Sequence, residues 1–223
     1  MHRLKSLAGF GFQPEYILDI GANVGSWTDQ MAHFFPDSHF LMIEANPKHE
    51  DHLQGICNQH QKVDFSINLL DEVEKDSRYY TIKNATADNL ETGNSIFKEK
   101  TNHYSDNNTE VKIIKSKTLD SLLENKKINK VDFIKLDVQG GELSVLKGAS
   151  KTLEQTTFCL LEVQLQQWNQ DAPLFSEVIS FMKENNFLVF DFIDKNLVSD
   201  YTVSIDVLFK KQNNKFTCPN ISK

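Results

Sequence analysis

The chain of 223 residues has little of several features that define whole classes of protein. Its three cysteines, Cys57, Cys159 and Cys218, lie far apart without a C-x-x-C pair, which excludes a disulfide framework and a cysteine zinc site. No apolar run approaches the roughly 20 residues of a membrane span. Residues 1–16 also lack the apolar core of a signal peptide. We therefore expect a cytoplasmic protein with reduced thiols and no membrane span.

Basic residues are few as well. The 24 lysines and arginines face 31 acidic residues, which gives a net charge of -7. Nucleic acids are bound by basic surfaces, and the lysines here are dispersed among acids, so we expect no nucleic-acid partner. The length suits one α/β domain with a sizeable core over residues 1–223, and it is short for two. Nothing in the sequence indicates the oligomeric state.

The most informative motif is YILDIGANVG at residues 16–25, where an apolar strand runs into a glycine turn that opens a helix. Gly21 and Gly25 are four apart, and Asn23 replaces the second glycine of the dinucleotide fingerprint. A buried carboxylate at Asp19 would repel a pyrophosphate, yet it suits the cationic groups of S-adenosylmethionine (SAM). A tight turn without a ligand is the alternative interpretation.

A second acid follows at the spacing that a nucleoside cofactor requires. Residues 39–44 form the next apolar strand, and its terminal Glu44 lies 23 residues after Gly21, close to the spacing at which an acid bonds ribose hydroxyls. The helix between them should start near Gly25 and end before Pro36. A terminal acid alone is often only solvated, but the two acids in one βαβ unit favour a cofactor pocket.

The rest of the chain alternates strands and helices. Strands are predicted at 63–69, 79–83, 111–116, 131–138, 158–163, 188–192 and 203–210, and helices begin at 119, at 142 (running to about 153) and near 173. This alternation predicts a doubly wound, mostly parallel sheet with helices on both faces. The segment of about 84–108 interrupts it. That segment is too polar for a core, so we expect either a surface loop or a lid over an acceptor site.

One block resembles a known family. Residues 137–149, DVQGGELSVLKGA, preceded by VDFIKL at 131–136 and joined to DIGANVG upstream, resemble the FkbM family of SAM-dependent methyltransferases. The resemblance extends over most of the chain, with supporting pieces at 43–47, 92–95, 118–122, 161–163 and 172–178. It implies a class I methyltransferase (Rossmann-like) α/β fold, with seven strands of which the last is antiparallel. It also implies O-methylation as the commonest activity.

The same resemblance implies site residues. In such proteins the glycine turn holds the methionine part of SAM, the acid after the second strand holds the ribose, and residues ending the third strand flank the adenine. Carried onto this chain, the cofactor positions are Asp19, Gly21, Ala22, Asn23, Gly25, Glu44, Asn46, Asn68 and Leu69. Asp137, at the end of the fourth strand, would face the methyl-transfer centre and also contact the cofactor.

An alcohol acceptor must lose its proton, so the site needs a base. Asp137 is the leading candidate, and Glu162 and Glu142 are the alternatives. Glu162 lies in a run too apolar for a surface acid, whereas Glu142 could simply stabilise a helix start. Asp137 and Glu162 could instead bind a divalent metal, but no H-x-x-H pair or dense acidic cluster supports a metal site, and we expect none.

The acceptor is predicted more loosely. A sugar site combines amide and hydroxyl partners with an aromatic wall, and Asn94, Ser95, Trp168 and Asn169 offer that mixture. The first hypothesis is therefore a methyltransferase acting on a hydroxyl of a sugar, glycan or small metabolite. An NAD-dependent oxidoreductase is the second, and a noncatalytic SAM-binding module on the same fold is the third.

Overall fold

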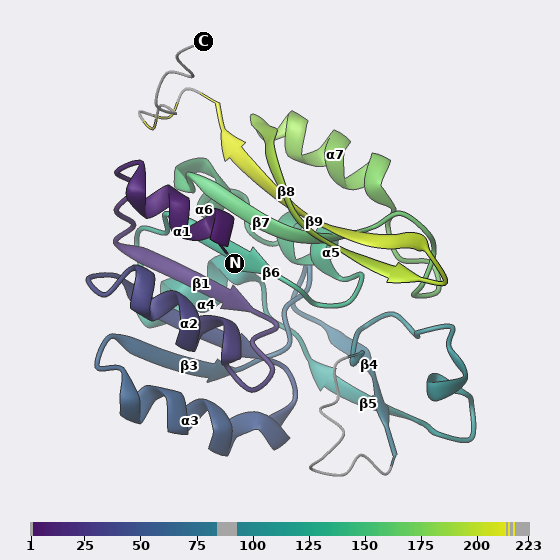
Figure 1. Cartoon of the computed structure of the whole chain (residues 1–223). Helices are drawn as coiled ribbons and strands as arrows, with labels where there is room; N and C mark the ends of the chain where they lie inside the picture. Colours follow the sequence, from purple (N-terminus) through teal and green to yellow (C-terminus); the bar gives the residue numbers. More distant parts are fainter. Residues whose placement is uncertain (1, 84–92, 213, 215, 217–223) are drawn as a thin grey trace.

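The computed structural model describes residues 2–83, 93–212, 214 and 216 (Figure 1). Its strands are β1 (Tyr16–Ile20), β2 (His39–Glu44), β3 (Val63–Ile67), β4 (Asp76–Ile82), β5 (Thr109–Lys115), β6 (Phe133–Leu136), β7 (Phe158–Gln164), β8 (Phe187–Val198) and β9 (Tyr201–Lys211). Its helices are α1 (His2–Gly9), α2 (Ser26–Phe34), α3 (Glu50–Gln59), α4 (Leu119–Lys126), α5 (Glu142–Lys147), α6 (Ser150–Gln155) and α7 (Phe175–Glu184), with 3-10 turns η1 (Pro47–His49) and η2 (Asn102–Tyr104).

Seven strands form the main sheet in the order β3-β2-β1-β6-β7-β9-β8. The pairs among β3, β2, β1, β6 and β7 are parallel, and β9 runs antiparallel to both of its neighbours. The predicted class I fold with an antiparallel last strand is therefore confirmed. The chain winds outward from β1 to β3 and then returns to β6 on the other side of β1. This reversal places a ligand crevice at the carboxyl ends of β1 and β6.

Helices cover both faces of this sheet, as the near-continuous apolar strands require. Alternate strand residues serve two separate cores. Ile17 and Phe40 pack in the core that includes residues of α1, α2 and α3. Leu18 and Leu41 pack in the opposite core, with residues of α4, α5, α6 and α7. Strands β1 and β2 therefore lie buried between two apolar layers.

Strands β4 and β5 form a separate antiparallel pair that stands beyond the carboxyl ends of β1 and β6 (Figure 1). The segment between them, about 84–108, was expected to be too polar for a core. Residues 84–92 lie outside the described part, but Ser95 and Tyr104 in the remainder are each only 2% exposed. Ser95 pairs with Tyr80 of β4 in a β-bridge. Ser95 and Tyr104 are therefore packed against the protein, whereas residues 105–108 are exposed.

One predicted helix is broken in two. The sequence pattern favours a helix from Glu142 to about residue 153, whereas the chain forms α5 and α6 with Gly148 between them. A β-carbon on Gly148 would lie 2.5 Å from the backbone oxygen of Asp71. The close approach of the segment before β4 therefore coincides with the break, a long-range contact that periodicity alone does not reveal.

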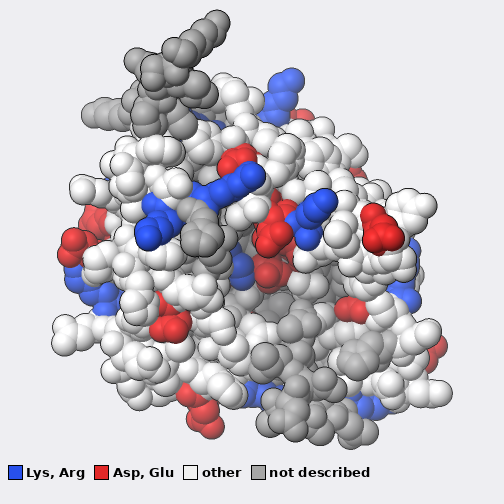
Figure 2. All heavy atoms as spheres, in the orientation of Figure 1, with Lys and Arg blue, Asp and Glu red and all other residues white. Residues whose placement is uncertain are grey.

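Within the described residues no helix is both long and apolar enough to cross a membrane. Cys57 and Cys159 carry free thiols, and Cys218 lies outside the described residues. On the face drawn in Figure 2, lysine and arginine side chains are interspersed with acidic ones, and no broad area of one sign appears. That face agrees with the dispersed charges seen in the sequence.

Candidate functional site

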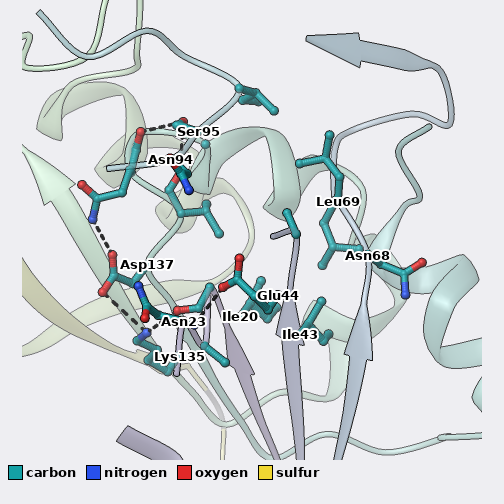
Figure 3. Close-up of a pocket in the computed structure, with 18 of the residues that line it drawn as sticks. Ile20, Asn23, Ile43, Glu44, Asn68, Leu69, Asn94, Ser95, Lys135 and Asp137 are labelled. Carbon is teal, nitrogen blue, oxygen red and sulfur yellow. Dashed lines mark hydrogen bonds and ion pairs between the residues drawn. The ribbon is translucent and has the colours of Figure 1, made fainter. Parts of the chain in front are cut away.

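A cavity of about 310 Å³ opens at the carboxyl ends of β1, β2 and β6 (Figure 3). The turn after β1, the ends of β2 and β6, and residues 68–70 after β3 form one wall. Residues 94–96, which follow β4, contribute the other. The cavity therefore lies at the crevice that the strand order creates, between the main sheet and the β4–β5 pair.

The glycine turn after β1 is pressed against the end of β6. Gly21 has φ +76°, and a β-carbon there would overlap the backbone oxygen of Asp137. Its N–H donates to Ile43 O at 2.8 Å. Asn23 has φ +51°, a left-handed conformation that asparagine tolerates better than most residues. The turn therefore needs a glycine at position 21, where a side chain would not fit, and a residue that tolerates the left-handed conformation at position 23.

Glu44 ties this turn to the end of β2. Its Oε2 accepts the N–H of Asn23 and its Oε1 accepts the N–H of Asn46, each at 2.8 Å. Burial raises the pKa of Glu44, and these two backbone N–H groups oppose the rise. A carboxylate has about four lone-pair sites, so Glu44 can still accept hydrogen bonds from a ligand in the cavity that it lines.

Lys135 of β6 lies beneath the turn between two acids. Its Nζ is 3.2 Å from Asp19 Oδ1 and 3.5 Å from Asp137 Oδ2, and it donates to Gly21 O at 3.2 Å. Burial alone would lower the pKa of Lys135, but the two carboxylates together outweigh it and raise the pKa. Asp19 is fully buried, also accepts the hydroxyl of Thr28 at 2.7 Å, and is absent from the cavity lining. Asp19 therefore supports the turn from behind.

Asp137 and Glu162 are joined through one amide. Gln139 Nε2 donates to Asp137 Oδ1 at 2.8 Å and to Glu162 Oε2 at 2.9 Å, from a backbone with φ +56°. Burial raises the pKa of Glu162 to about 8, and the charges of Asp137 and Glu142 add to the shift. Asp137 and Gln139 line the cavity, whereas Glu162 lies behind Gln139.

Glu142, the other predicted candidate base, is only 3% exposed. Its Oε1 accepts the N–H of Val138 at 2.9 Å, and it begins helix α5. Burial raises the pKa of Glu142 to about 8, although the backbone N–H groups favour its charged form. It does not line the cavity. These contacts suit an acid that fixes the turn after β6.

The wall of the cavity formed by residues 94–96 is held by hydrogen bonds to other segments. Ser95 Oγ donates to Gln139 O at 2.8 Å, and Asn94 Oδ1 accepts the hydroxyl of Tyr104 at 3.1 Å. Asn169 is fully buried; its amide donates to Phe97 O at 3.2 Å and its Oδ1 accepts Gln164 Nε2 at 2.7 Å. Asn169 therefore supports the segment of residues 94–97 from outside the cavity.

The structure brings most of the predicted site residues together. Lining the cavity are Gly21, Ala22, Asn23, Glu44, Asn68, Leu69, Asn94, Ser95 and Asp137. Absent from the lining are Asp19, Gly25, Asn46, Glu142, Glu162, Trp168 and Asn169. Sequence reasoning missed Lys135, Gln139 and Tyr79, which also line it. A lysine in the middle of an apolar strand was the available signal for Lys135, because a buried ammonium needs acidic partners.

Comparison with known proteins agrees with this geometry. Residues 19–189 match the model of the methyltransferase FkbM domain, which is most of the chain. The chain belongs to the FkbM methyltransferase family. It is similar to hexuronic acid methyltransferase AglP of Haloferax volcanii, with 28% identity over 83 residues. That match covers 34% of this chain and only 35% of the relative.

Solved structures share the fold of this FkbM protein at low identity. Magnesium protoporphyrin IX methyltransferase (ChlM) from Synechocystis PCC 6803 with bound SAM matches 94% of this chain and 77% of its own, with TM-score 0.53 and 10% identity. The fibrillarin pre-rRNA processing protein of Methanococcus jannaschii matches 91% and 68%, with TM-score 0.54 and 13% identity. At such identities these likenesses establish the fold alone.

The chain therefore carries a SAM-dependent methyltransferase domain of the FkbM family, and the family match does not support the hypothesis of an NAD-dependent oxidoreductase. The cavity fits SAM, because the backbone approaches closely at Gly21 and Glu44 offers acceptors to hydroxyls. Its charges fit as well. The charged residues that line it are the acids Glu44 and Asp137 and the cation Lys135, which also pairs with the buried Asp19. This excess of acid suits the ammonium and sulfonium of the cofactor.

Proposed function

We propose that this methyltransferase O-methylates a hydroxyl group of a sugar, glycan or small metabolite. One observation carries the proposal: Asp137 lines a single cavity together with the glycine turn at Gly21 and with Asn94 and Ser95 on the opposite wall. Figure 3 shows Asn94 and Ser95 across the cavity from Glu44. An amide and a hydroxyl suit a polyhydroxylated acceptor. A relative whose name specifies a hexuronic acid supports the same class.

The cofactor side would be held by the residues already fixed in place. Glu44 would accept the ribose hydroxyls, the turn at 21–24 would contact the methionine part, and Asn68 and Leu69 would flank the adenine. When bound, SAM would supply an electrophilic methyl group. The acceptor oxygen would form a bond to the methyl carbon as the bond from that carbon to the sulfonium breaks, and S-adenosylhomocysteine would leave. The protein contributes orientation and the exclusion of water from the cavity.

Asp137 is the group that we assign to the acceptor proton. It is the acid of the trio Asp137, Glu142 and Glu162 that lines the cavity, so it alone of the three faces a bound hydroxyl. Lys135 and Gln139 each engage one of its oxygens and thereby fix the orientation of the carboxylate. Glu162, held by Asn196 and Ser204, would position Gln139 rather than touch the acceptor.

The direct test combines SAM carrying an isotopically labelled methyl group with a panel of free sugars, uronic acids and glycan fractions. We expect label on an oxygen of one acceptor, located by mass spectrometry and NMR. Asp137→Asn should lower turnover about a hundredfold or more while affinity for S-adenosylhomocysteine changes little. Label on nitrogen or carbon would overturn O-methylation. Tight cofactor binding without turnover across the panel would favour the noncatalytic module instead.

A further inference from the structure

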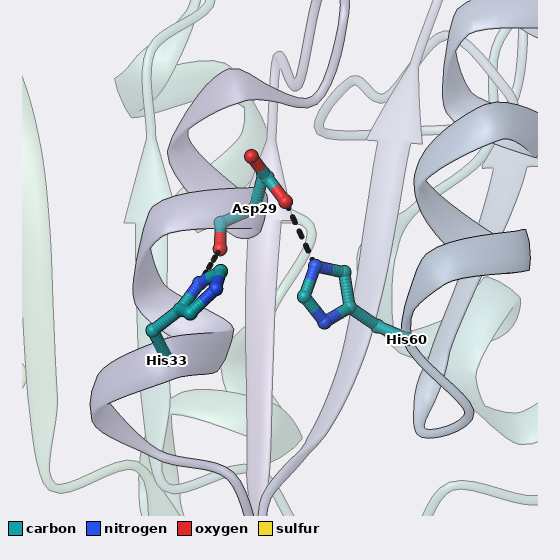
Figure 4. Close-up of side chains that lie close together, drawn as sticks. All are labelled: Asp29, His33 and His60. Carbon is teal, nitrogen blue, oxygen red and sulfur yellow. Dashed lines mark hydrogen bonds and ion pairs between the residues drawn. The ribbon is translucent and has the colours of Figure 1, made fainter.

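Three metal-ligating side chains meet at a place that methyl transfer does not use. Asp29, His33 and His60 each offer one ligand atom, and these atoms all lie within 4.8 Å of one another. Asp29 and His33 are one turn apart on α2, and His60 directly follows α3 (Figure 4). None of the three lines the cofactor cavity. Their convergence therefore needs an explanation of its own.

Hydrogen bonds already orient both imidazoles. His33 Nδ1 lies 2.8 Å from the backbone oxygen of Asp29. A carbonyl can only accept, so Nδ1 of His33 is the donor, and the neutral ring then carries its lone pair on Nε2. Metal-binding histidines are commonly fixed in this way by a carbonyl behind the ring. His33 is therefore set in the tautomer that a metal ligand requires.

The second imidazole faces the carboxylate. His60 Nε2 lies 2.8 Å from Asp29 Oδ1, and the two histidine rings meet edge to face with centroids 5.5 Å apart. Ligand atoms around tetrahedral zinc stand about 3.4 Å apart, given bonds of about 2.0 to 2.2 Å. A bound ion would replace the hydrogen bond between His60 Nε2 and Asp29 Oδ1. One ligand atom from each of the three residues already lies within 4.8 Å of the others.

The donor set indicates the kind of ion. Two imidazole nitrogens and one carboxylate oxygen suit a borderline transition-metal ion, whereas Mg²⁺ and Ca²⁺ prefer oxygen ligands. The side chains of Asp29 and His60 are 39% and 21% exposed, so an ion and a coordinated water can enter from solvent. A partly exposed histidine–aspartate pair by itself contributes little to stability, which leaves the arrangement without a strong structural role.

We propose that Asp29, His33 and His60 form a surface site for Zn²⁺ that links α2 to the end of α3. Water would complete the tetrahedral coordination. Both helices follow segments that build the cofactor side, since α2 begins after the glycine turn and α3 begins after η1. A bound ion would therefore cross-link the layer that supports the cofactor wall. The site is independent of the acceptor and of methyl transfer.

The test uses the full chain, treated with a chelator and then titrated calorimetrically with Zn²⁺. We expect one ion per chain and a higher melting temperature with Zn²⁺ than with Mg²⁺. His33→Ala and His60→Ala should each weaken Zn²⁺ binding at least tenfold. His52→Ala is the matched control, because His52 is an exposed histidine on α3 outside the cluster, and its affinity for Zn²⁺ should equal that of the wild type.

Folding does not confound this comparison. The His33 side chain is exposed, so His33→Ala should retain the circular dichroism spectrum and melting temperature of the metal-free protein. Wild-type Zn²⁺ affinity in that variant would overturn the site. Absence of Zn²⁺ binding in the wild type, or an equal loss of affinity in His52→Ala, would overturn it as well. Because binding and melting are the readouts, failure here is distinguishable from an inactive methyltransferase.

Discussion

The two walls of the cavity are built by different kinds of contact. On the cofactor wall, backbone N–H groups are the donors: the N–H of Gly21 donates to Ile43 O, and the carboxylate of Glu44 accepts the N–H groups of Asn23 and Asn46. On the acceptor wall, Asn94 and Ser95 are held by side-chain bonds to Tyr104 and to the turn after β6. A wall of the second kind can change its residues without disturbing the sheet, which lets one fold accept different substrates.

The sharpest test of the cofactor wall is Gly21→Ala. A β-carbon at this left-handed position would overlap the backbone oxygen of Asp137, so we expect a loss of roughly 3 kcal/mol or more in the free energy of unfolding and loss of measurable S-adenosylhomocysteine binding. Gly55→Ala on α3 is the control, because it meets nothing within 4 Å and should be neutral or slightly stabilising. Urea unfolding measures the stability of the two variants, and calorimetry measures their affinity for S-adenosylhomocysteine. Equal stability and equal affinity in the two variants would mean that the turn accommodates a β-carbon at position 21.

A second substitution removes the charge beneath that wall. Lys135→Met leaves Asp19 and Asp137 without their cation, and breaking such a buried arrangement costs about 3 to 5 kcal/mol. Adding Asp19→Asn should restore part of the loss, because it removes the fully buried charge. The measurement is the denaturant midpoint of the two variants. A double variant less stable than Lys135→Met would show that the lysine does not neutralise Asp19.

The third prediction uses pH to separate a structural acid from the reacting one. Glu142 has a pKa of about 8 in the folded protein, against about 4.3 when unfolded, so the folded state binds more protons between these values. Its contribution to stability is complete below about pH 4 and is lost as pH rises through 8. Glu142→Gln keeps an acceptor for Val138 N–H and should raise stability at pH 8 by a few kcal/mol at most.

Activity completes that test. Since Glu142 does not line the cavity, Glu142→Gln should keep turnover near the wild-type value, in contrast to Asp137→Asn. Glu162 also has a pKa raised to about 8, so part of the pH dependence of stability should persist in the Glu142 variant. A hundredfold loss of turnover in Glu142→Gln would transfer the role of base to Glu142.

The smallest expected effects compare two asparagines on opposite walls. Asn94→Ala removes one neutral hydrogen bond and a polar group of the acceptor wall, so KM for the acceptor should rise about fivefold while S-adenosylhomocysteine affinity stays within about threefold. Asn68→Ala, on the cofactor wall, should show the reverse pattern. Steady-state kinetics gives KM for the acceptor in each variant, and calorimetry gives the affinity for S-adenosylhomocysteine. The division into two walls fails if each substitution affects both ligands equally.

Sequence reasoning succeeded where function depends on local chain geometry. The strand, turn and helix at 16–25 and the acid at Glu44 were predicted from spacing alone, and Gly21, Asn23 and Glu44 do line one cavity. It was less informative where a side chain has distant partners. Asp19 lies behind the glycine turn, where it pairs with Lys135. Trp168 and Asn169 are also absent from the lining. The type and position of all three residues favoured direct contact with a ligand.

The sequence by itself determined the sheet and the turn, because alternating apolar segments and glycine spacing act over a few residues and need no knowledge of the remaining chain. It also indicated the family, through the resemblance of the block at 137–149. Only the tertiary structure decided which polar groups face the cavity and which are neutralised beneath it. The joining of Asp137 to Glu162 by Gln139, the break at Gly148 and the meeting of His33 with His60 depend on contacts between segments far apart in the chain. Such contacts arise from packing, and no local period in the sequence encodes them.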